Sequence, residues 1–376
     1  MARKKNNSKF SMLVFSRSEN LRESNSYKNA VIYHLSGGGN ALRASKWIAT
    51  KLSEKGINTL VMPFNKIKEK SQESKERMLV GFVFPTHGFT IIWSMLLAIL
   101  SFPKSQNKND VFILSTVGGT KLFSLFIPGF PGSSLILPQI ILMIKGYRVV
   151  GTTALNMPAH WAALFPPMGK KTNSAIVERC NGVTERFIEK ILNGQRTYYY
   201  CWLLPIIIVS IPISFLYLFV GRLGLPKIYF FSTKCNGCGI CKNNCPVNAI
   251  KMLGNRPYWT IRCESCQRCI NFCPNKAVQA SLLYMILIFL VYSSVFDKWF
   301  GLKLNEFLTA YMGIFAGITS FIIWNVLCIL LLYATYPIML ILIRIKFINK
   351  IFTYTSITRY YGRYREPNTK IQDFDN

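Results

Sequence analysis

Two stretches of sequence, Lys234–Pro246 (KCNGCGICKNNCP) and Arg262–Pro274 (RCESCQRCINFCP), decide the fold of the centre of this chain. Each has three cysteines separated by pairs of residues, then a fourth cysteine three residues later, followed by proline. Cysteines at such short, repeated spacing are typical of metal ligands. The two stretches therefore predict a metal-binding module with eight ligands, which are Cys235, Cys238, Cys241, Cys245, Cys263, Cys266, Cys269 and Cys273.

The repeat favours iron–sulfur clusters over zinc. Four-cysteine zinc sites also use C-x-x-C pairs, but they rarely need a repeated C-x-x-C-x-x-C triplet followed by x-x-x-C-P. The pattern resembles the clostridial-type ferredoxin with two [4Fe-4S] clusters, in which each fourth cysteine binds the other cluster. The resemblance implies two ligand sets: Cys235, Cys238, Cys241 and Cys273, and Cys263, Cys266, Cys269 and Cys245. Gln267 and Arg268 depart from the family, where a glycine like Gly239 is common, and the Arg268 cation is expected to raise the second cluster's potential.

Composition excludes a purely soluble protein. Hydrophobic residues make up 51% of the 376 residues and charged residues only 16%, against about 25% charge in soluble domains. Lysine and arginine number 45 against 16 acids, and this surplus indicates a polyanionic neighbour such as an anionic membrane surface. No secretory signal is evident, and most cysteines have metal-ligand spacing, so a reducing compartment is expected.

The first half of the chain predicts a basic disordered arm, 1–28, and an α/β domain, 29–196. Amphipathic stretches such as Ala41–Lys55 and Thr172–Leu192 separate short apolar runs. Continuous apolar strands with crossovers between them favour an open, doubly wound parallel sheet. The predicted strands are Ala30–Leu35, Asn58–Pro63, Met78–Phe84, Asp110–Ser115 and Tyr147–Thr152.

A glycine-rich loop follows the first predicted strand and opens a helix, an arrangement that directs backbone N–H groups at an anion. The loop resembles the phosphate loop of flavodoxins, although Gly38 and Ala41 replace two hydroxyl residues, and it implies an FMN site with weakened binding. Its residues are Ser36, Gly37, Gly38, Gly39, Asn40 and Ala41. Two further segments match the loops that hold the flavin ring in that family, and they are Pro85, Thr86, His87, Gly88 and Phe89, and Thr116, Val117, Gly118 and Gly119.

Segments Lys145–Gly151 and Asn156–Pro158 extend the likeness. Together with the cysteine motifs they make residues 29–280 resemble the flavodoxin–ferredoxin fusions of anaerobic bacteria and archaea. Phe89, Trp93 and Trp161 are candidates to stack on a flavin, although core packing is the better interpretation for each.

Few other residues indicate chemistry. The three histidines are His34, expected as a satisfied core residue, His87 and His160. Asp110 is the single acid between Arg77 and Val177, which argues against a paired-carboxylate site there. Outside the motifs, small buried thiols are expected at Cys180, Cys201 and Cys328.

The remaining segments predict membrane association. Within 197–228, Trp202–Val220 is uncharged and long enough to span, but a crossing would separate the two redox domains, so a re-entrant or interfacial helix is expected. The cysteine-rich module, 229–279, is followed by a transmembrane hairpin, 280–343, built from Ala280–Phe296 and Phe307–Tyr333. The connector Asp297–Glu306 is expected outside the cell, and the basic, then polar tail, 344–376, inside.

These features predict a membrane-anchored electron-transfer protein with its redox domains facing the cytoplasm, passing electrons between FMN and two [4Fe-4S] clusters. Two alternatives remain open at this point. One is a flavin-dependent reductase of a quinone or small molecule, with Asn156–Phe165 as the candidate substrate loop. The other is a ferredoxin attached to a flavin-free docking domain. Nucleic acid is not an expected partner, and the redox partner stays undetermined.

Overall fold

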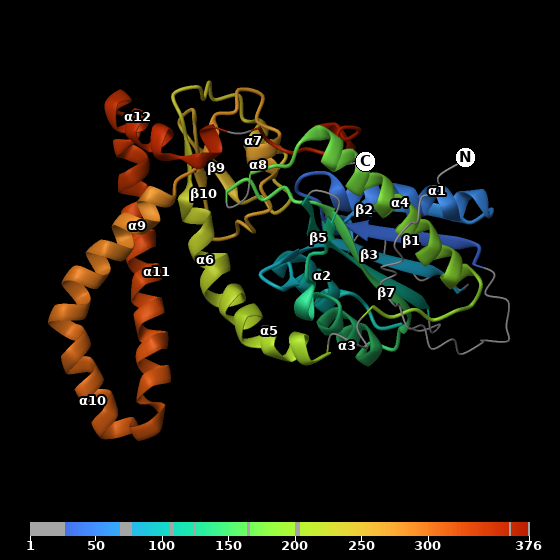
Figure 1. Ribbon diagram of the computed structural model, residues 1–376, viewed down its shortest axis with the longest axis horizontal. Helices are drawn as coiled ribbons and strands as arrows, with labels where there is room; N and C mark the ends of the chain where they lie inside the picture. The colour runs from blue at the N-terminus through green and yellow to red at the C-terminus, as the bar shows by residue number, and fades with distance from the viewer. Residues whose placement is uncertain are drawn as a thin grey trace, which may run out of the picture.

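The computed structural model describes residues 27–67, 77–105, 109–122, 125–163, 166–199, 204–360 and 362–374. An α/β domain, a cysteine-rich module and a long helical hairpin follow one another along the chain (Figure 1). Of the predicted basic arm, 1–28, only Tyr27 and Lys28 fall within the described residues.

The α/β domain is built on a parallel sheet, as the sequence predicted. The order of its parallel strands is β2-β1-β3-β5-β7, which is the 2-1-3-4-5 order of flavodoxin-like doubly wound folds. Residues Ala30–His34 of β1 pair with both neighbours, so this strand is central. The strands are β1 (Asn29–His34), β2 (Asn58–Pro63), β3 (Leu79–His87), β5 (Asp110–Leu122) and β7 (Arg148–Pro158).

Three of these strands run further than their apolar cores predicted. Because Val117, Gly118 and Gly119 pair with the end of β7, they lie in strand β5 rather than in a loop. The end of β3 turns back into the short antiparallel strand β4 (Thr90–Ile91), and the end of β5 pairs with β6 (Leu125–Ile127). Pro85–His87 and Thr116–Gly119, expected as cofactor loops, are therefore strand residues.

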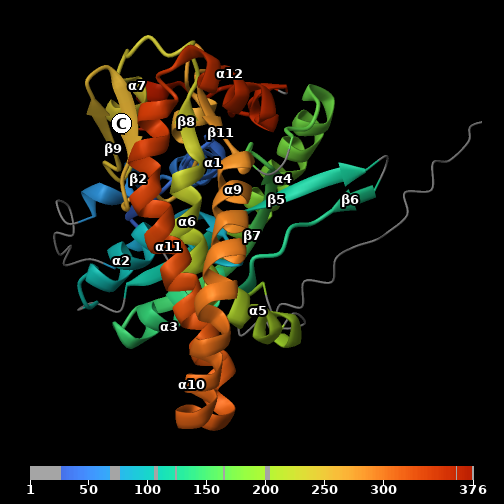
Figure 2. The ribbon, with the colours of Figure 1, turned by 90° about the vertical axis from the view of Figure 1, so that its left-hand side faces the viewer.

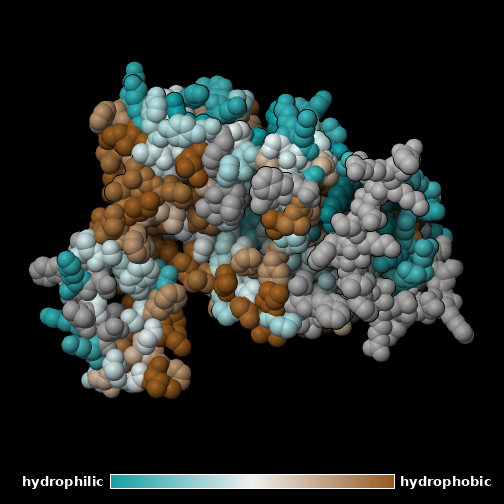
Figure 3. Space-filling view, in the orientation of Figure 1, coloured by the Kyte–Doolittle hydropathy of each residue, from teal (hydrophilic) through white to brown (hydrophobic). Residues whose placement is uncertain are grey.

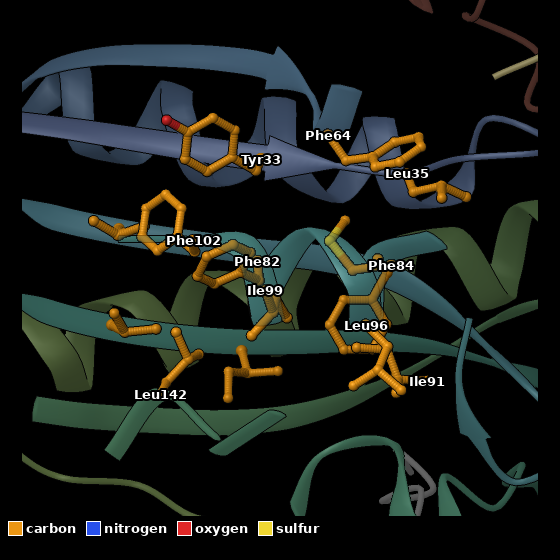
Figure 4. Close-up of a cluster of buried hydrophobic side chains, with 14 of the residues drawn as sticks. Tyr33, Leu35, Phe64, Phe82, Phe84, Ile91, Leu96, Ile99, Phe102 and Leu142 are labelled. Carbon is orange, nitrogen blue, oxygen red and sulfur yellow. The ribbon is translucent and has the colours of Figure 1, made fainter. Parts of the chain in front are cut away.

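Helices cover both faces of the sheet. Alternate residues of β1 point to opposite sides, so Ile32 packs with α1 (Asn40–Glu54) and α4 (Lys170–Leu192), whereas Tyr33 packs with α2 (Trp93–Ser101) and α3 (Ile136–Ile144). Figure 4 shows the second of these cores, in which Tyr33, Phe82 and Phe102 lie ring against ring.

The cysteine-rich module consists of one short hairpin, one antiparallel pair of strands and two single-turn helices. Its first and last strands pair with each other and so close the module on itself. Its elements are β8 (Tyr229–Phe231), α7 (Ile240–Asn243), β9 (Ile250–Leu253), β10 (Arg256–Trp259), α8 (Arg268–Asn271) and β11 (Val278–Ala280). Trp259 and Tyr229 are fully buried in a core that the module shares with Tyr284 and Tyr336 of the hairpin.

The hairpin extends from the module (Figure 2), and hydrophobic residues gather on its surface (Figure 3). Two helices of the described residues, Pro205–Ile228 and Glu306–Leu342, are long and apolar enough to cross a membrane, with mean hydropathies of 2.1 and 2.3. The helices before and after the cysteine-rich module are α5 (Leu204–Leu216), α6 (Arg222–Gly224), α9 (Leu282–Val291), α10 (Leu302–Met312), α11 (Ala316–Leu342) and α12 (Lys346–Thr355).

The turn of the hairpin differs from the prediction. Asp297–Glu306 was expected as an exposed connector, but these residues continue the helix through a π-helical stretch, Tyr292–Gly301, into α10. The chain reverses later, at Gly313–Phe315, where Gly313 has a φ of 50°. Charged residues were a misleading turn signal here, because they are compatible with a helix that exposes them, whereas the left-handed backbone at Gly313 ends it.

Candidate metal centre and its contacts with the glycine-rich loop

The two cysteine motifs fold in the same way. Gly239 precedes α7 with a φ of 72°, and Gln267 precedes α8 with a φ of 62°. Asn248 and Lys276, which follow the two C-P pairs, have φ values of 49° and 50°. Left-handed backbone is uncommon for residues other than glycine, so its recurrence at equivalent positions shows that the repeated sequence forms a repeated structure.

The fourth cysteine of each motif accepts the same backbone hydrogen bond. Ala249 donates its N–H to Cys245 Sγ, and Ala277 donates to Cys273 Sγ, both at 3.2 Å. A donor aimed at sulfur stabilises the negatively charged thiolate, which is the form that binds metal. The two motifs therefore place their fourth sulfur in the same local setting.

The cysteines gather in the combinations that cross-ligation requires. A pocket is lined by four thiols and by the apolar side chains of Met252, Pro257 and Val278, and the thiols are those of Cys235, Cys238, Cys241 and Cys273. On the other side of the module, burial raises the pKa of Cys263 well above its ordinary value, and the nearby thiols of Cys266 and Cys245 raise it further. Each motif thus contributes its fourth cysteine to the neighbourhood of the other.

Two groups of four thiols are the donor set that [4Fe-4S] clusters use, and a four-cysteine zinc site uses the same donors. The repeated sequence motif is what favours clusters. Two [4Fe-4S] clusters would supply one-electron transfer at these two positions.

The two positions differ in exposure. Cys238 of the first motif is exposed, whereas Cys263 and Cys266 of the second are buried. The second motif is covered by the α/β domain, because the backbone carbonyl of Cys266 lies against Gly37. The first position is therefore accessible from solvent, and the second lies inside the protein.

Two buried cations lie beside the second motif. Arg268 is 6% exposed and lies close to Cys266, where burial raises the pKa of the thiol to about 11 and the charge of Arg268 opposes part of that rise. Lys227 is fully buried and donates to the carbonyl of Trp259 at 2.7 Å. Burial lowers the pKa of its ammonium group to about 8, and the nearby Cys263 opposes that decrease. Arg268 was found from the sequence, but Lys227 was not, since nothing near it in the chain marks it as a neighbour of the cysteines.

The glycine-rich loop is enclosed by protein. A side chain at Gly37 would meet the carbonyl oxygen of Cys266 at 1.9 Å, one at Gly38 would meet the ring of His160 at 2.9 Å, and one at Gly39 would meet Glu366 at 2.6 Å. Every residue from Ser36 to Ala41 is buried. The glycines leave room for other groups to approach the loop backbone closely, and those groups belong to other parts of this chain.

Hydrogen bonds fasten these neighbours to the loop. The guanidinium of Arg268 donates to the carbonyl of Ser36 at 2.6 and 3.2 Å, and the amide of Glu366 donates to the carbonyl of Gly38 at 2.8 Å. Asn40 donates to Pro158 and accepts from the hydroxyl of Tyr364. The Glu366 carboxylate pairs with Arg43 in the first turn of α1. The backbone and Cβ of Glu366 therefore lie against the loop where an FMN phosphate was expected, and the loop in this arrangement does not fit that group.

The segments predicted to hold the flavin ring are also occupied. Trp161 stacks on His87 with ring centroids 5.8 Å apart and donates to the carbonyl of Ser265. A side chain at Gly88 would meet the ring of Tyr217 at 2.1 Å. Phe89 lies beside Phe130, and Trp93 lies under the guanidinium of Arg222. The candidate stacking residues thus contact protein groups.

The other predicted residues are placed as follows. His34 is 1% exposed, but neither ring nitrogen has a hydrogen-bond partner among the described residues, so it is buried without being satisfied. Asp110 accepts hydrogen bonds from Tyr27, Arg77 and Arg148 at the amino-terminal edge of the sheet. Cys180 is buried and Cys328 partly buried, whereas Cys201 and Phe165 lie outside the described residues.

Comparison of the sequence with known protein families identifies one part of the chain. The family described as "4Fe-4S binding domain" matches residues 228–251, which hold the first cysteine motif. A search of curated proteins found no match.

Solved structures align with the α/β part. A flavodoxin from the domain Archaea is 16% identical and covers 43% of this chain and 98% of its own, with a TM-score of 0.28. A Streptococcus pneumonia TIGR4 flavodoxin is 13% identical and covers 43% and 99%, with a TM-score of 0.28. The rubredoxin oxygen:oxidoreductase from Desulfovibrio gigas is 15% identical and covers 46% of this chain but 37% of its own, with a TM-score of 0.29. The fold assignment depends on the observed strand order, and the chain combines a flavodoxin-like parallel sheet with a 4Fe-4S binding domain.

Proposed function

We propose that this protein transfers electrons through two [4Fe-4S] clusters held by the cysteine-rich module. The observation that carries the proposal is the repeated local structure of the two motifs, each with a left-handed turn before its helix and an N–H···S bond to its fourth cysteine. The proposed ligand sets are those that the sequence predicted. The pocket lined by Cys235, Cys238, Cys241 and Cys273 supports the first of them.

The difference in exposure between the two motifs suggests which cluster would exchange electrons with an external partner. Cys238 is exposed, so the first cluster would exchange electrons with an external redox protein. The second cluster would lie beneath the α/β domain, near Trp161 and Glu264. Burial together with the cations Arg268 and Lys227 would give it a different reduction potential from the first, because both solvent exposure and nearby charge influence the potential.

The α/β domain acts in this proposal as a docking platform for the second motif. Its glycine-rich loop contacts Cys266, Arg268 and Glu366, which are the groups that fill the predicted phosphate site. An FMN phosphate would reach the loop only after the segment around Glu366 had moved away. The flavin-free docking domain is therefore the alternative that the contacts favour.

We further propose that the helical segments attach the protein to the cytoplasmic face of a membrane. Apolar side chains on α11 that are more than half exposed, such as Ile318, Phe321 and Ile322, support insertion of the hairpin. Pro205–Ile228 has a different role in this proposal. Arg268 and Trp161 join the α/β domain to the cysteine-rich module directly, so both domains would lie on the same side of the bilayer. Pro205–Ile228 would then lie at the bilayer surface without crossing it.

Anaerobic purification of the full chain in detergent tests the proposal. Two clusters require close to eight iron atoms per chain, and the reduced protein should give the electron paramagnetic resonance signal of interacting [4Fe-4S]⁺ centres. Flavin is measured on the same sample by its fluorescence after denaturation. An iron content near zero with bound zinc would refute electron transfer, whereas stoichiometric FMN would refute the docking role of the α/β domain alone.

A further inference from the structure

A polar cavity of about 270 Å³ lies between the cysteine-rich module and the segment that follows α12. The module contributes Ser232, Lys234 and Lys276 to its wall, and the later segment contributes Thr358, Arg359 and Arg363. The cavity is separate from the pocket lined by the cysteines of the first set. Neither the cluster ligands nor the glycine-rich loop accounts for it.

The charge of the cavity wall has one sign. Four cationic side chains line it, and none of the lining residues is acidic. In the described part of the chain, neither Lys234 nor Lys276 pairs with a carboxylate. Arg363 is fixed in place, because it donates to the carbonyls of Ile270 at 2.6 Å and of Lys276 at 3.0 Å. Lys234, Lys276 and Arg359 are exposed, so solvent weakens their mutual repulsion, but an anion entering the cavity would be attracted by all four charges.

Ser232 gives a second, independent indication. Its side chain is 1% exposed and lines the cavity, yet its hydroxyl has no hydrogen-bond partner among the described residues. A buried hydroxyl without a partner is costly. An anion in the cavity would accept its hydrogen bond and neutralise the surrounding cations at the same time.

We propose that this cavity binds a phosphate-bearing anion. Its volume lies just below the range for ligand pockets, which begins at about 300 Å³, so it admits a phosphate group or a lipid headgroup but not a large ligand. Helix α12 borders the cavity through Thr353, and it exposes Phe347, Ile351 and Tyr354 to solvent. This apolar helix beside a cationic cavity suits an anionic phospholipid, with the headgroup in the cavity and the helix at the interface.

A bound anion would act on the first cluster. The amide of Lys276 donates to the carbonyl of Cys273 at 3.1 Å, and Cys273 belongs to the first proposed ligand set. Negative charge brought next to a cluster disfavours its reduction, so binding would make its reduction potential more negative. This consequence depends on the proposed function, whereas binding itself does not.

Thermal unfolding of the full chain in detergent measures binding with two probes, inorganic phosphate and short-chain dihexanoyl-phosphatidylglycerol. Each should raise the midpoint of unfolding of the wild type. Losing one charge-assisted hydrogen bond weakens affinity by roughly tenfold or more. Lys234→Gln and Arg359→Gln should therefore raise the probe concentration needed for half-maximal stabilisation by at least that factor. Arg262→Gln, at an exposed cation of the same module outside the cavity, is the matched control and should bind as the wild type does.

Ser232→Ala separates a ligand contact from a structural defect. If the hydroxyl serves the anion, this variant is as stable as the wild type without the probe or more so, and it binds the probe more weakly. Stabilisation by the lipid alone assigns the site to a headgroup, and stabilisation by both probes assigns it to phosphate in general. The proposal is wrong if neither probe stabilises the wild type, or if the cavity variants and Arg262→Gln respond alike. The iron content of these variants is measured as well. If it equals that of the wild type, a failure to bind the probes refutes the anion site without refuting the electron-transfer proposal.

Discussion

Replacing Gly37 with alanine should separate the cysteine-rich module from the glycine-rich loop. The new methyl group would lie 1.9 Å from the carbonyl oxygen of Cys266 and 2.9 Å from its carbonyl carbon. These are backbone atoms, so no side-chain rotation relieves the overlap. The segment around Cys266 must instead move by about 1.5 Å, which is the difference between 1.9 Å and the 3.4 Å at which ordinary contact begins.

The expected cost follows from what moves with Cys266. Overpacking of a closely packed contact costs about 1–3 kcal/mol, and a shift also lengthens the two hydrogen bonds from Arg268 to Ser36. The loss falls mainly on the contact between the α/β domain and the module, because all eight cysteines are kept and the second motif can move as a unit away from the loop. Iron content should stay as in the wild type while the loop region opens more often.

Hydrogen–deuterium exchange measured by mass spectrometry detects such local opening. The amides of residues 36–41 and of Glu366, which donates to Gly38, should exchange about 5- to 150-fold faster, corresponding to the same 1–3 kcal/mol of opening free energy. Gly182→Ala is the matched control, since it makes the same change in helix α4, where the nearest neighbour is the side chain of Arg186 at 3.4 Å. It should stabilise that helix by about 1 kcal/mol and leave the loop unchanged.

One result would refute the reasoning. If Gly37→Ala exchanged at the wild-type rate in both segments, Cys266 would not lie against the loop in solution. The loop would then be open to an external phosphate, and the interpretation of the α/β domain as a docking platform would have to be abandoned. Measuring the FMN content of the same variant would show whether the flavin, rather than Cys266, occupies the space beside Gly37.

Three further predictions address the clusters and the segment around Glu366. Cys273→Ala should damage the cluster held by the first motif and spare the other, as judged by iron content and electron paramagnetic resonance; loss of the second cluster alone would contradict cross-ligation. Arg43→Ala leaves the 1%-exposed Glu366 carboxylate without its partner, so limited proteolysis should cut 362–374 faster, and an unchanged cleavage rate would argue against the ion pair. Lys227→Met removes a buried cation near Cys263 and should lower that cluster's potential in a redox titration, whereas the exposed Lys251→Met should have no such effect.

The sequence predicted the parts of the fold that depend on local pattern. Continuous apolar runs identified the five parallel strands, because strands buried on both faces need apolar residues throughout. Spacing alone identified the cysteine-rich module. The ends of β5 and β7 were missed, since Val117–Gly119 is glycine-rich and Asn156–Pro158 contains asparagine and proline, which are uncommon in strands. These two segments are strands because they pair with each other.

The local sequence also could not show which group contacts the glycine-rich loop. Glycines at 37–39 indicate that something approaches the backbone closely, but the glycine pattern is the same whether that is a phosphate or a peptide carbonyl. The groups that do approach, Cys266, His160 and Glu366, are remote in sequence, and Glu366 resembles any solvated acid of a polar tail. Tertiary contact alone distinguishes the two interpretations.

The contact between Arg43 and Glu366 also has a bearing on how the protein is assembled. The two residues are 323 positions apart, so helix α1 is synthesised long before the segment that covers its first turn. The cysteine motifs lie between them in the chain, and the second motif is enclosed by the same neighbours. If Cys263 and Cys266 hold a cluster as proposed, it would be inserted most easily while that side is still open, and the arrival of residues 362–374 would set a time limit on maturation. Slow iron–sulfur delivery during synthesis would leave the inner site closed and empty while the outer one, near Cys238, could still be loaded.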